Sequence, residues 1–169
     1  MPPRVPPLRP NNLIETLTRH GVEFVVIGGI ASVLQGAPYT TFDLDIVYAR
    51  SEENLDRLEA ALAELEAEIH DPTDRRLAPS RSLLTTPGPK LLRTRYGRLD
   101  LLGQLDEATD WEQLLADTEA MPFHQHQLRV LRLERVIEQK ERLGRDKDCA
   151  ALPLLRATLA RRSRDRNDE

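Results

Sequence analysis

The sequence predicts an α/β (α+β) domain, and three observations support this fold class. Two short apolar segments, 23–27 and 42–48, are rich in β-branched and aromatic residues and have the composition of buried strands. Several other segments repeat apolar residues at intervals of three and four, as amphipathic helices do. A chain of 169 residues with 40% hydrophobic residues is long enough to enclose one core. We therefore expect a single domain over residues 11–161.

The two ends of the chain are expected to lie outside this domain. Residues 1–10 contain five prolines, which disfavour helix and predict a flexible, extended arm. Residues 162–169 are mostly charged and predict a disordered tail. Neither end is expected to carry chemistry.

Caps, glycines and apolar spacing predict the elements of the first half. Asn11 or Asn12 can cap the first helix, and Ser51 can cap a long helix with a leucine stripe. The expected elements are a helix from Asn11 or Asn12 to Gly21, a strand over 23–27, a short helix over 30–35, a strand over 42–48, and a long helix from Ser51 through Ile69.

The second half is predicted in the same way. Residues 70–88, rich in proline, arginine and serine, are typical of a long surface loop. Tyr96-Gly97 suits a tight hairpin turn and Asp110 suits a helix cap. The expected elements are hairpin arms over 90–95 and 98–103, a helix after Asp110, irregular or strand-like structure over 121–131, and helices over 132–143 and 146–161.

Whole-chain properties narrow the function classes. A formal net charge of -4 argues against an extended basic surface for duplex nucleic acid. The single cysteine, Cys149, excludes an internal disulfide framework and a multi-cysteine zinc site. No apolar segment reaches the length of a signal peptide core or a membrane span. We therefore expect a cytoplasmic protein with no membrane partner.

Two aspartates on one strand are the most informative feature. Asp43 and Asp45 are one residue apart, so on a strand they point to the same face. Asp100 lies between leucines on another predicted strand, and can join them if the two strands are neighbours. Three carboxylates suit a magnesium site, and two such ions about 3.5 to 4 Å apart support in-line phosphoryl displacement. Alternatively, Asp100 is an exposed hairpin acid paired with Arg98.

Gly28-Gly29 ends one predicted strand and opens a short helix. Exposed N–H groups at such a turn favour a phosphate, and missing side chains allow its close approach. Ser32, just downstream, can also touch phosphate. The chain has no Gly-Lys-Ser or Gly-Lys-Thr, so this is not a Walker A loop. An ordinary strand-to-helix turn is the alternative.

A family resemblance connects these motifs. Val26-Ile27-Gly28-Gly29, followed after thirteen residues by Asp43-Leu44-Asp45 and later by Leu99-Asp100-Leu101-Leu102, resembles the DNA polymerase β-type nucleotidyltransferase superfamily. Within it, the chain is similar to small bacterial nucleotidyltransferase-like proteins related to toxin-antitoxin and abortive-infection transferases. The resemblance covers residues 12–160. It implies a nucleotidyltransferase fold: a short, mixed β-sheet flanked by helices, with a C-terminal helical segment closing over the nucleotide.

The resemblance also implies roles for individual residues. Gly28 and Gly29 would hold the nucleoside triphosphate, and Asp43 and Asp45 would bind magnesium, as two ions, with manganese as an alternative. Asp100 would be the third carboxylate and the base, or a base-assisting ligand, for the acceptor hydroxyl.

The C-terminal helices supply further candidates. Lys140 lies within the apolar stripe of its predicted helix, and Asp148 shares a face with leucines on the next one. The passage from Lys140 to Asp148 resembles a C-terminal element of these transferases, which implies that Lys140 and Lys147 contact the triphosphate while Asp148 orients them. A purely structural Lys140–Asp148 bridge is the alternative.

The function expected from these residues is transfer of a nucleoside monophosphate from a triphosphate to an acceptor hydroxyl on tRNA, a protein or a small molecule. The resemblance implies ATP or another nucleoside triphosphate as donor, and a cognate antitoxin or other protein as partner. A second hypothesis is a catalytically silent nucleotide-binding or partner-binding module. It is motivated by Tyr39, near which the family frequently carries an arginine that this chain lacks.

Overall fold

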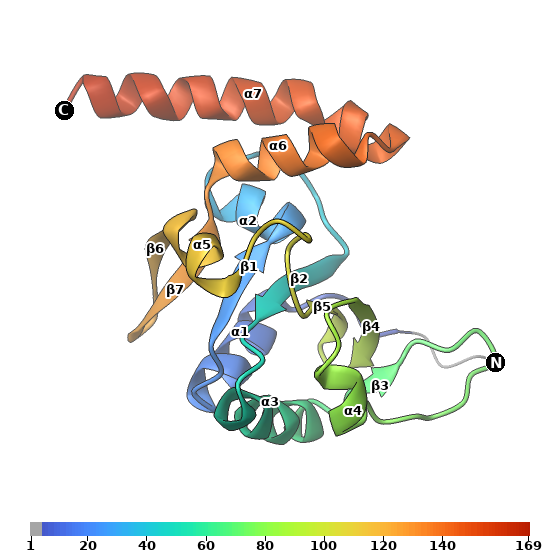
Figure 1. Ribbon diagram of the computed structural model, residues 1–169. Helices are drawn as coiled ribbons and strands as arrows, with labels where there is room; N and C mark the ends of the chain where they lie inside the picture. Colours follow the sequence, from blue (N-terminus) through green and yellow to red (C-terminus); the bar gives the residue numbers. More distant parts are fainter. Residues whose placement is uncertain (1–4) are drawn as a thin grey trace.

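A computed structural model describes residues 5–169, which form one mixed sheet between two layers of helices (Figure 1). Helices α1 (Pro10–Arg19) and α3 (Glu52–Glu64) cover one face, together with the short α4 (Arg81–Leu84). On the other side, α2 (Gly28–Leu34) lies beneath α6 (Leu133–Leu143) and α7 (Asp146–Asn167). The predicted fold class, a mixed sheet flanked by helices with a C-terminal helical segment, is confirmed.

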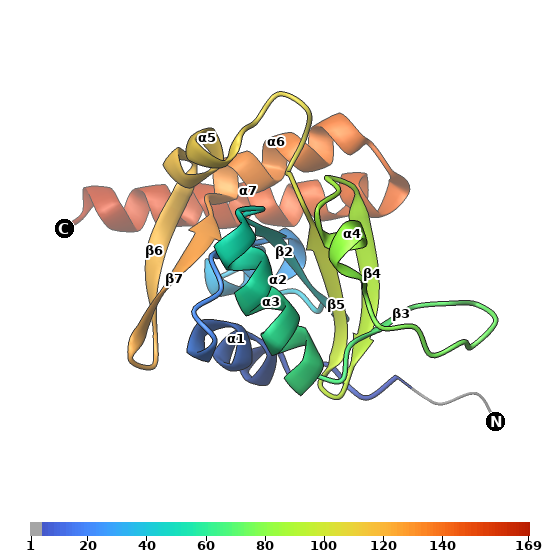
Figure 2. The same ribbon diagram turned by 60° about the horizontal axis from the view of Figure 1, so that its bottom comes forward.

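The described residues form a seven-stranded sheet in the order β3-β4-β5-β2-β1-β7-β6. Strands β2 and β5 are parallel, as are β1 and β7, and the other neighbours are antiparallel. Figure 2 shows the β6–β7 hairpin on one side of the molecule and β3 and β4 on the other. The strands are β1 (Phe24–Ile27), β2 (Asp43–Tyr48), β3 (Glu68–Ile69), β4 (Pro89–Thr94), β5 (Gly97–Leu102), β6 (Thr118–Phe123) and β7 (His126–Leu131).

Two predicted helix caps are confirmed. The Ser51 side chain accepts a hydrogen bond from the Asn54 N–H at the start of α3. Asp110 and Gln113 form a reciprocal capping box at the start of α5 (Trp111–Ala116). In each case a local side chain satisfies a free N–H of the first turn, which is why sequence alone predicts these helix starts.

Three predicted boundaries are wrong. Helix α1 begins at Pro10, not after an asparagine cap, because proline suits the first turn of a helix. Helix α3 ends at Glu64, since Glu66 adopts a left-handed φ of 52° that reverses the chain and leaves Ile69 in β3. The hairpin turn falls one residue early, because Thr94 pairs with Gly97 and leaves Arg95-Tyr96 as the loop.

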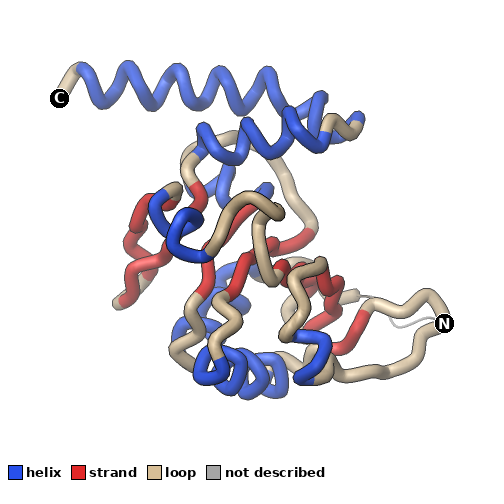
Figure 3. The backbone as a smooth tube through the Cα atoms, in the orientation of Figure 1, coloured by secondary structure: helices blue, strands red, loops and turns tan. Residues whose placement is uncertain are grey.

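Two segments have more structure than the sequence predicts. The 70–88 loop contains α4, although 70–80 is a long irregular connection (Figure 3). Residues 118–131 form a complete hairpin, β6–β7, where only irregular or strand-like structure was expected from 121 on. The pairing of β7 with β1 supplies the stability that composition does not reveal.

The chain ends also differ from expectation. Residues 1–4 of the predicted arm lie outside the described residues, but the Arg9 N–H donates to the Tyr96 carbonyl oxygen at 2.9 Å. At the other end, the segment expected to be disordered is helical up to Asn167. Arg162 anchors it by donating to Gln35 Oε1 (2.8 Å) and Glu119 Oε1 (2.7 Å). Side-chain contacts distant in sequence thus order this tail.

Candidate active site

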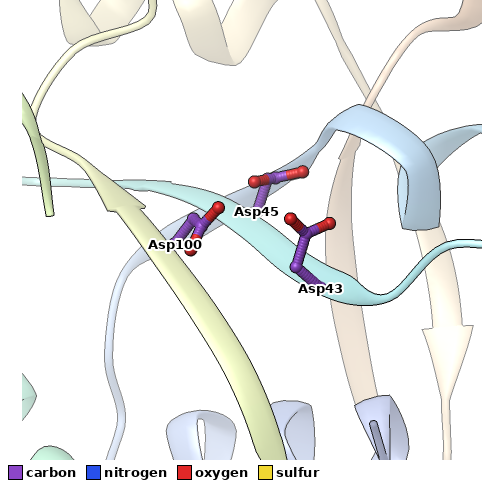
Figure 4. A group of neighbouring side chains, drawn as sticks. All are labelled: Asp43, Asp45 and Asp100. Atoms are coloured by element: carbon purple, nitrogen blue, oxygen red, sulfur yellow. The ribbon is translucent and has the colours of Figure 1, made fainter. Parts of the chain in front are cut away.

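Strand register places the aspartates together. Asp45 lies opposite Asp100 in the parallel pair β2·β5, and opposite Ile27, which precedes Gly28, in the antiparallel pair β1·β2. Residues paired across strands share a face, so the carboxylates of Asp43, Asp45 and Asp100 project from one surface (Figure 4). The two strands are neighbours, so Asp100 joins Asp43 and Asp45, which was the condition for a shared site.

The three carboxylates form an acidic triad, the name used below for Asp43, Asp45 and Asp100. Each offers an oxygen, and these oxygens lie within 4.8 Å of one another. Asp100 is 8% exposed, and its Oδ1 is buried without a hydrogen-bond partner. A buried acceptor without a hydrogen-bond partner is costly, and a cation bound to the triad would offset that cost.

The triad has unusual proton affinities. Burial, followed by repulsion from Asp43 and Asp100, raises the pKa of Asp45 to about 7. Burial and the charge of Asp43 raise the pKa of Asp100 to about 6, although the charge of Arg98 opposes this rise. A cation paired with the carboxylates would offset their mutual repulsion and stabilise their ionised forms, so the triad suits a bound cation.

The raised pKa values predict how pH affects the cation-free protein. The folded chain keeps protons on Asp45 and Asp100 at pH values where the unfolded chain, with pKa near 3.8, has lost them. Stability from this site is therefore lost as pH rises from about 4 to about 7, by on the order of 2 kcal/mol. Urea unfolding with a chelator present measures this loss, as the difference in unfolding free energy between wild type and Asp45→Asn at each pH.

That difference isolates the site because carboxylates with lowered pKa, such as Asp148, contribute the opposite slope to both proteins. The stabilisation of Asp45→Asn over wild type should grow with pH. Asp165→Asn removes a carboxylate on the exposed surface of α7, outside the site, and is the control variant. A constant or shrinking advantage for Asp45→Asn would contradict the electrostatic interpretation.

The glycine turn is built against the triad. Gly28 begins α2 with a left-handed φ of 64°, and a Cβ there would collide with Oδ2 of Asp45 and lie 3.1 Å from its Cγ. A Cβ on Gly29 would lie 2.8 Å from Thr41 Oγ1 and 2.9 Å from Tyr39 Oη. The Gly28 position therefore requires glycine for conformation and for space, and the Gly29 position requires it for space. The turn thus brings the backbone against the Asp45 side chain.

Tyr39 lies in the loop where the family resemblance led us to expect an arginine. Its hydroxyl lies near Gly29, and its pKa is raised by burial and then by the charges of Asp45, Asp43 and Asp148. The phenol therefore remains a neutral hydrogen-bond donor beside the turn. Its position depends on the 36–41 loop, whose conformation no sequence pattern specifies.

Helices α6 and α7 bring charges to the same region. Asp148 is 1% exposed, accepts hydrogen bonds from Arg145 Nε (2.6 Å) and Nη2 (3.3 Å), and lies 3.5 Å from Lys140 Nζ. Burial alone would raise the pKa of Asp148, but the hydrogen bond and charge of Arg145, followed by Lys140, hold it below its ordinary value. The charge of Lys140 also reaches Asp45. The predicted Lys140–Asp148 pair is thus present, close to the triad.

Ser32 and Lys147, which were predicted to contact the nucleotide, lie where a direct contact with the triad region is not evident. Ser32 is fully buried, and its hydroxyl donates to the Gly28 carbonyl oxygen at 3.2 Å, so it supports the turn. Lys147 is exposed and, among residues 5–169, forms no ion pair. Arg145, which the sequence reading missed, is the residue that pairs with Asp148. Its position three residues before a helical aspartate was the available signal.

The sheet order and the position of the triad together identify the fold. A mixed sheet carries a glycine turn after β1, two acids on β2 and a third on the neighbouring parallel strand β5. This is the nucleotidyltransferase fold, as the comparisons with solved structures show.

Three solved structures illustrate the likeness. LnuA, a lincosamide antibiotic adenylyltransferase solved with lincomycin, has a TM-score of 0.59 at 12% identity, over 90% of this chain and 99% of that one. ANT(2'')-Ia, solved with adenylyl-2''-tobramycin, gives 0.55 at 16%, over 87% and 85%. A protein of Thermotoga maritima, assigned as a nucleotidyltransferase, gives 0.52 at 21%, over 86% and 92%.

Sequence comparisons add no closer relative. No protein-family model matches the chain, and no curated protein matches it significantly. Among residues 5–169, no helix is both long and apolar enough to cross a bilayer. The comparisons therefore establish the fold, and the activity has to be argued from the site.

Proposed function

We propose that the protein is a divalent-metal-dependent nucleotidyltransferase. It would transfer a nucleoside monophosphate from a nucleoside triphosphate to an acceptor hydroxyl and release pyrophosphate. The observation that carries this proposal is the acidic triad with an unpartnered Asp100 oxygen, set against a glycine turn that has no room for a side chain. The first feature suits a cation and the second suits the phosphates that accompany it.

The donor set fits magnesium or manganese. Both cations favour oxygen ligands, and the triad offers three carboxylates whose oxygens lie within 4.8 Å. Asp43, Asp45 and Asp100 would hold the cation, and it would supply charge neutralisation at the triphosphate. The repulsion that raises the pKa of Asp45 would be relieved by the same cation.

The protein's own groups would position the reactants. Gly28 and Gly29 allow the triphosphate to approach the backbone, and Lys140 brings a positive charge towards the same side, held by buried Asp148. The acceptor oxygen would form a bond to the α-phosphorus as the bond to pyrophosphate breaks. Asp100 is the proposed recipient of the hydroxyl proton, since its Oδ1 accepts no hydrogen bond from the described residues.

The acceptor can be approached experimentally. Two of the structural neighbours hold an antibiotic or an adenylylated antibiotic, which supports including small hydroxyl compounds beside tRNA and protein acceptors. Purified protein with magnesium and α-labelled triphosphates should label one acceptor class, and a chelator should stop the labelling. Failure to label any class, with intact triphosphate binding by calorimetry, would instead favour a silent nucleotide-binding module.

Metal binding should also be visible without turnover. Magnesium or manganese added to chelator-treated protein should raise the melting temperature at about pH 8, because a cation that binds only the folded chain stabilises it by mass action. Asp100→Asn should remove most of this rise, whereas Asp165→Asn on exposed α7 should keep it. Equal rises in all three proteins would place the cation elsewhere.

A further inference from the structure

Residues paired across four neighbouring strands form a row through the site, and the two ends of this row differ. It runs from Ile27 on β1, through Asp45 on β2 and Asp100 on β5, to Leu91 on β4. The glycine turn therefore lies at the β1 end, and β4 and β5 line the opposite end. In-line transfer places the attacking and leaving oxygens on opposite sides of phosphorus. If the pyrophosphate lies towards the turn, the acceptor approaches from the β4–β5 end.

Two arginines, Arg98 on β5 and Arg93 on β4, lie at that end, and Arg98 is the one on the strand next to β2. It lies opposite Asp43 in β2·β5 and two residues before Asp100, so its side chain projects from the triad's face. It is half-buried, on the strand that also carries Asp100. Even so, Arg98 forms no ion pair within 4.0 Å among residues 5–169. Its charge is close to the triad but not directly paired with it.

Arg98 lies beside another arginine on β4, and the repulsion between the two charges is destabilising. Arg93 lies directly opposite Arg98 in the antiparallel pair β4·β5, and like charges at that position are destabilising. Arg93 is compensated by Asp74 at 2.9 Å and Glu68 at 3.6 Å. Negative charge reaches Arg98 from the triad, which is not within ion-pair distance. Once a cation neutralises the triad, Arg98 becomes an uncompensated positive charge facing the acceptor side.

Leu91 adds an exposed apolar side chain to the β4–β5 end of the row. It is the direct cross-strand neighbour of Asp100, and 43% of its surface is exposed although it is a large apolar residue. A Cβ separation of about 5 Å is usual for such a pair, so a molecule at Asp100 also touches Leu91. The acceptor side therefore combines one cation with one apolar contact.

We propose that Arg98 and Leu91 select the acceptor, and that the acceptor carries an anionic group, a phosphate or a carboxylate, near the hydroxyl that receives the nucleotide. This inference rests on the proposed nucleotidyl transfer and specifies its substrate class. Arg98 binds the anion, Leu91 contacts the carbon skeleton next to it, and cationic acceptors are disfavoured by Arg98. The phosphate can belong to a free sugar phosphate or to the 3′ end of an RNA strand.

Transfer kinetics with four acceptors test the inference: ribose 5-phosphate, a short RNA with a free 3′ hydroxyl, neutral ribose, and the cationic aminoglycoside tobramycin. Wild type should label one of the two phosphate-bearing acceptors, and which one is labelled identifies the source of the phosphate. Arg98→Gln should raise the KM for that acceptor by about tenfold to a hundredfold, the range expected for losing a charge-assisted hydrogen bond. The KM for the triphosphate should change little.

Matched variants distinguish an effect on acceptor binding from an effect on folding. Arg98→Lys should recover much of the acceptor affinity, and Arg98→Glu should move preference towards tobramycin. Arg95→Gln, at the exposed turn of the same hairpin, should leave both KM values unchanged. Labelling of ribose or tobramycin alone by wild type, or an acceptor KM unaffected by Arg98→Gln and Arg98→Glu, would overturn the inference while leaving nucleotidyl transfer intact. Absence of transfer to every acceptor would instead count against the proposed function.

Discussion

Asp45→Asn is expected to lower nucleotidyl transfer by at least about a thousandfold, the scale of losing a central electrostatic contact in a transfer reaction. Asparagine keeps the size of the side chain but removes its charge. The position is central in the site because Asp45 lies between Asp100 and the residue before Gly28 in strand register. Single-turnover transfer from a labelled triphosphate, at saturating magnesium, measures the chemical step directly.

The same variant should be more stable than wild type when no cation is present. Burial and the charges of Asp43 and Asp100 disfavour the ionised form of Asp45, so removing that charge relieves repulsion by on the order of 2 kcal/mol at about pH 8. Lower activity together with a higher melting temperature is the signature of a functional cluster. An inactive variant that melts lower would indicate simple misfolding, and full activity would end the metal-dependent proposal.

Gly28→Ala is expected to abolish most activity and to destabilise the fold. The left-handed φ of 64° costs an alanine about 1 to 2 kcal/mol, and its Cβ would displace the Asp45 carboxylate with which it collides. The lost activity follows from that displacement, since a shift of about 1 Å in a reacting group costs on the order of a hundredfold. Transfer rate and urea unfolding, measured on the same preparation, record both effects.

Gly21→Ala is the matched control for this change. Gly21 also has a left-handed φ, 72°, but a Cβ there would meet only the flexible Arg57 side chain, at 3.7 Å. The two substitutions thus share the backbone cost and differ in the collision with Asp45. Gly21→Ala should lose stability yet keep its transfer rate. Equal activity losses in both variants would show that backbone strain, and not displacement of Asp45, is responsible.

Local patterns predicted much of this site because their physical causes are local. Alternation along a strand places Asp43 and Asp45 on one face, and the Gly28-Gly29 pair indicates a tight approach of backbone to a neighbour. The caps at Ser51 and Asp110 depend on side chains within three residues of the N–H groups they bind. None of these features requires knowledge of the rest of the fold.

Other features depended on contacts between distant segments. Helix α7 continues to Asn167 because Arg162 reaches Gln35 and Glu119, which no composition rule reveals. Arg145, and not Lys147, pairs with Asp148, because the turn of chain between α6 and α7 sets which basic residue faces the site. The role inferred for Arg98 arises only from its neighbours on β2 and β4.

By itself, the sequence determined the fold class, the strand that carries two acids, and the glycines that must lie beside them. Only the tertiary structure decided that Asp100 pairs with Asp45, that its Oδ1 is buried without a hydrogen-bond partner, and that Leu91 and Arg98 lie on the same sheet face as the triad. The reason is physical: side-chain alternation is a property of one strand, whereas register is set by the packing of the whole sheet.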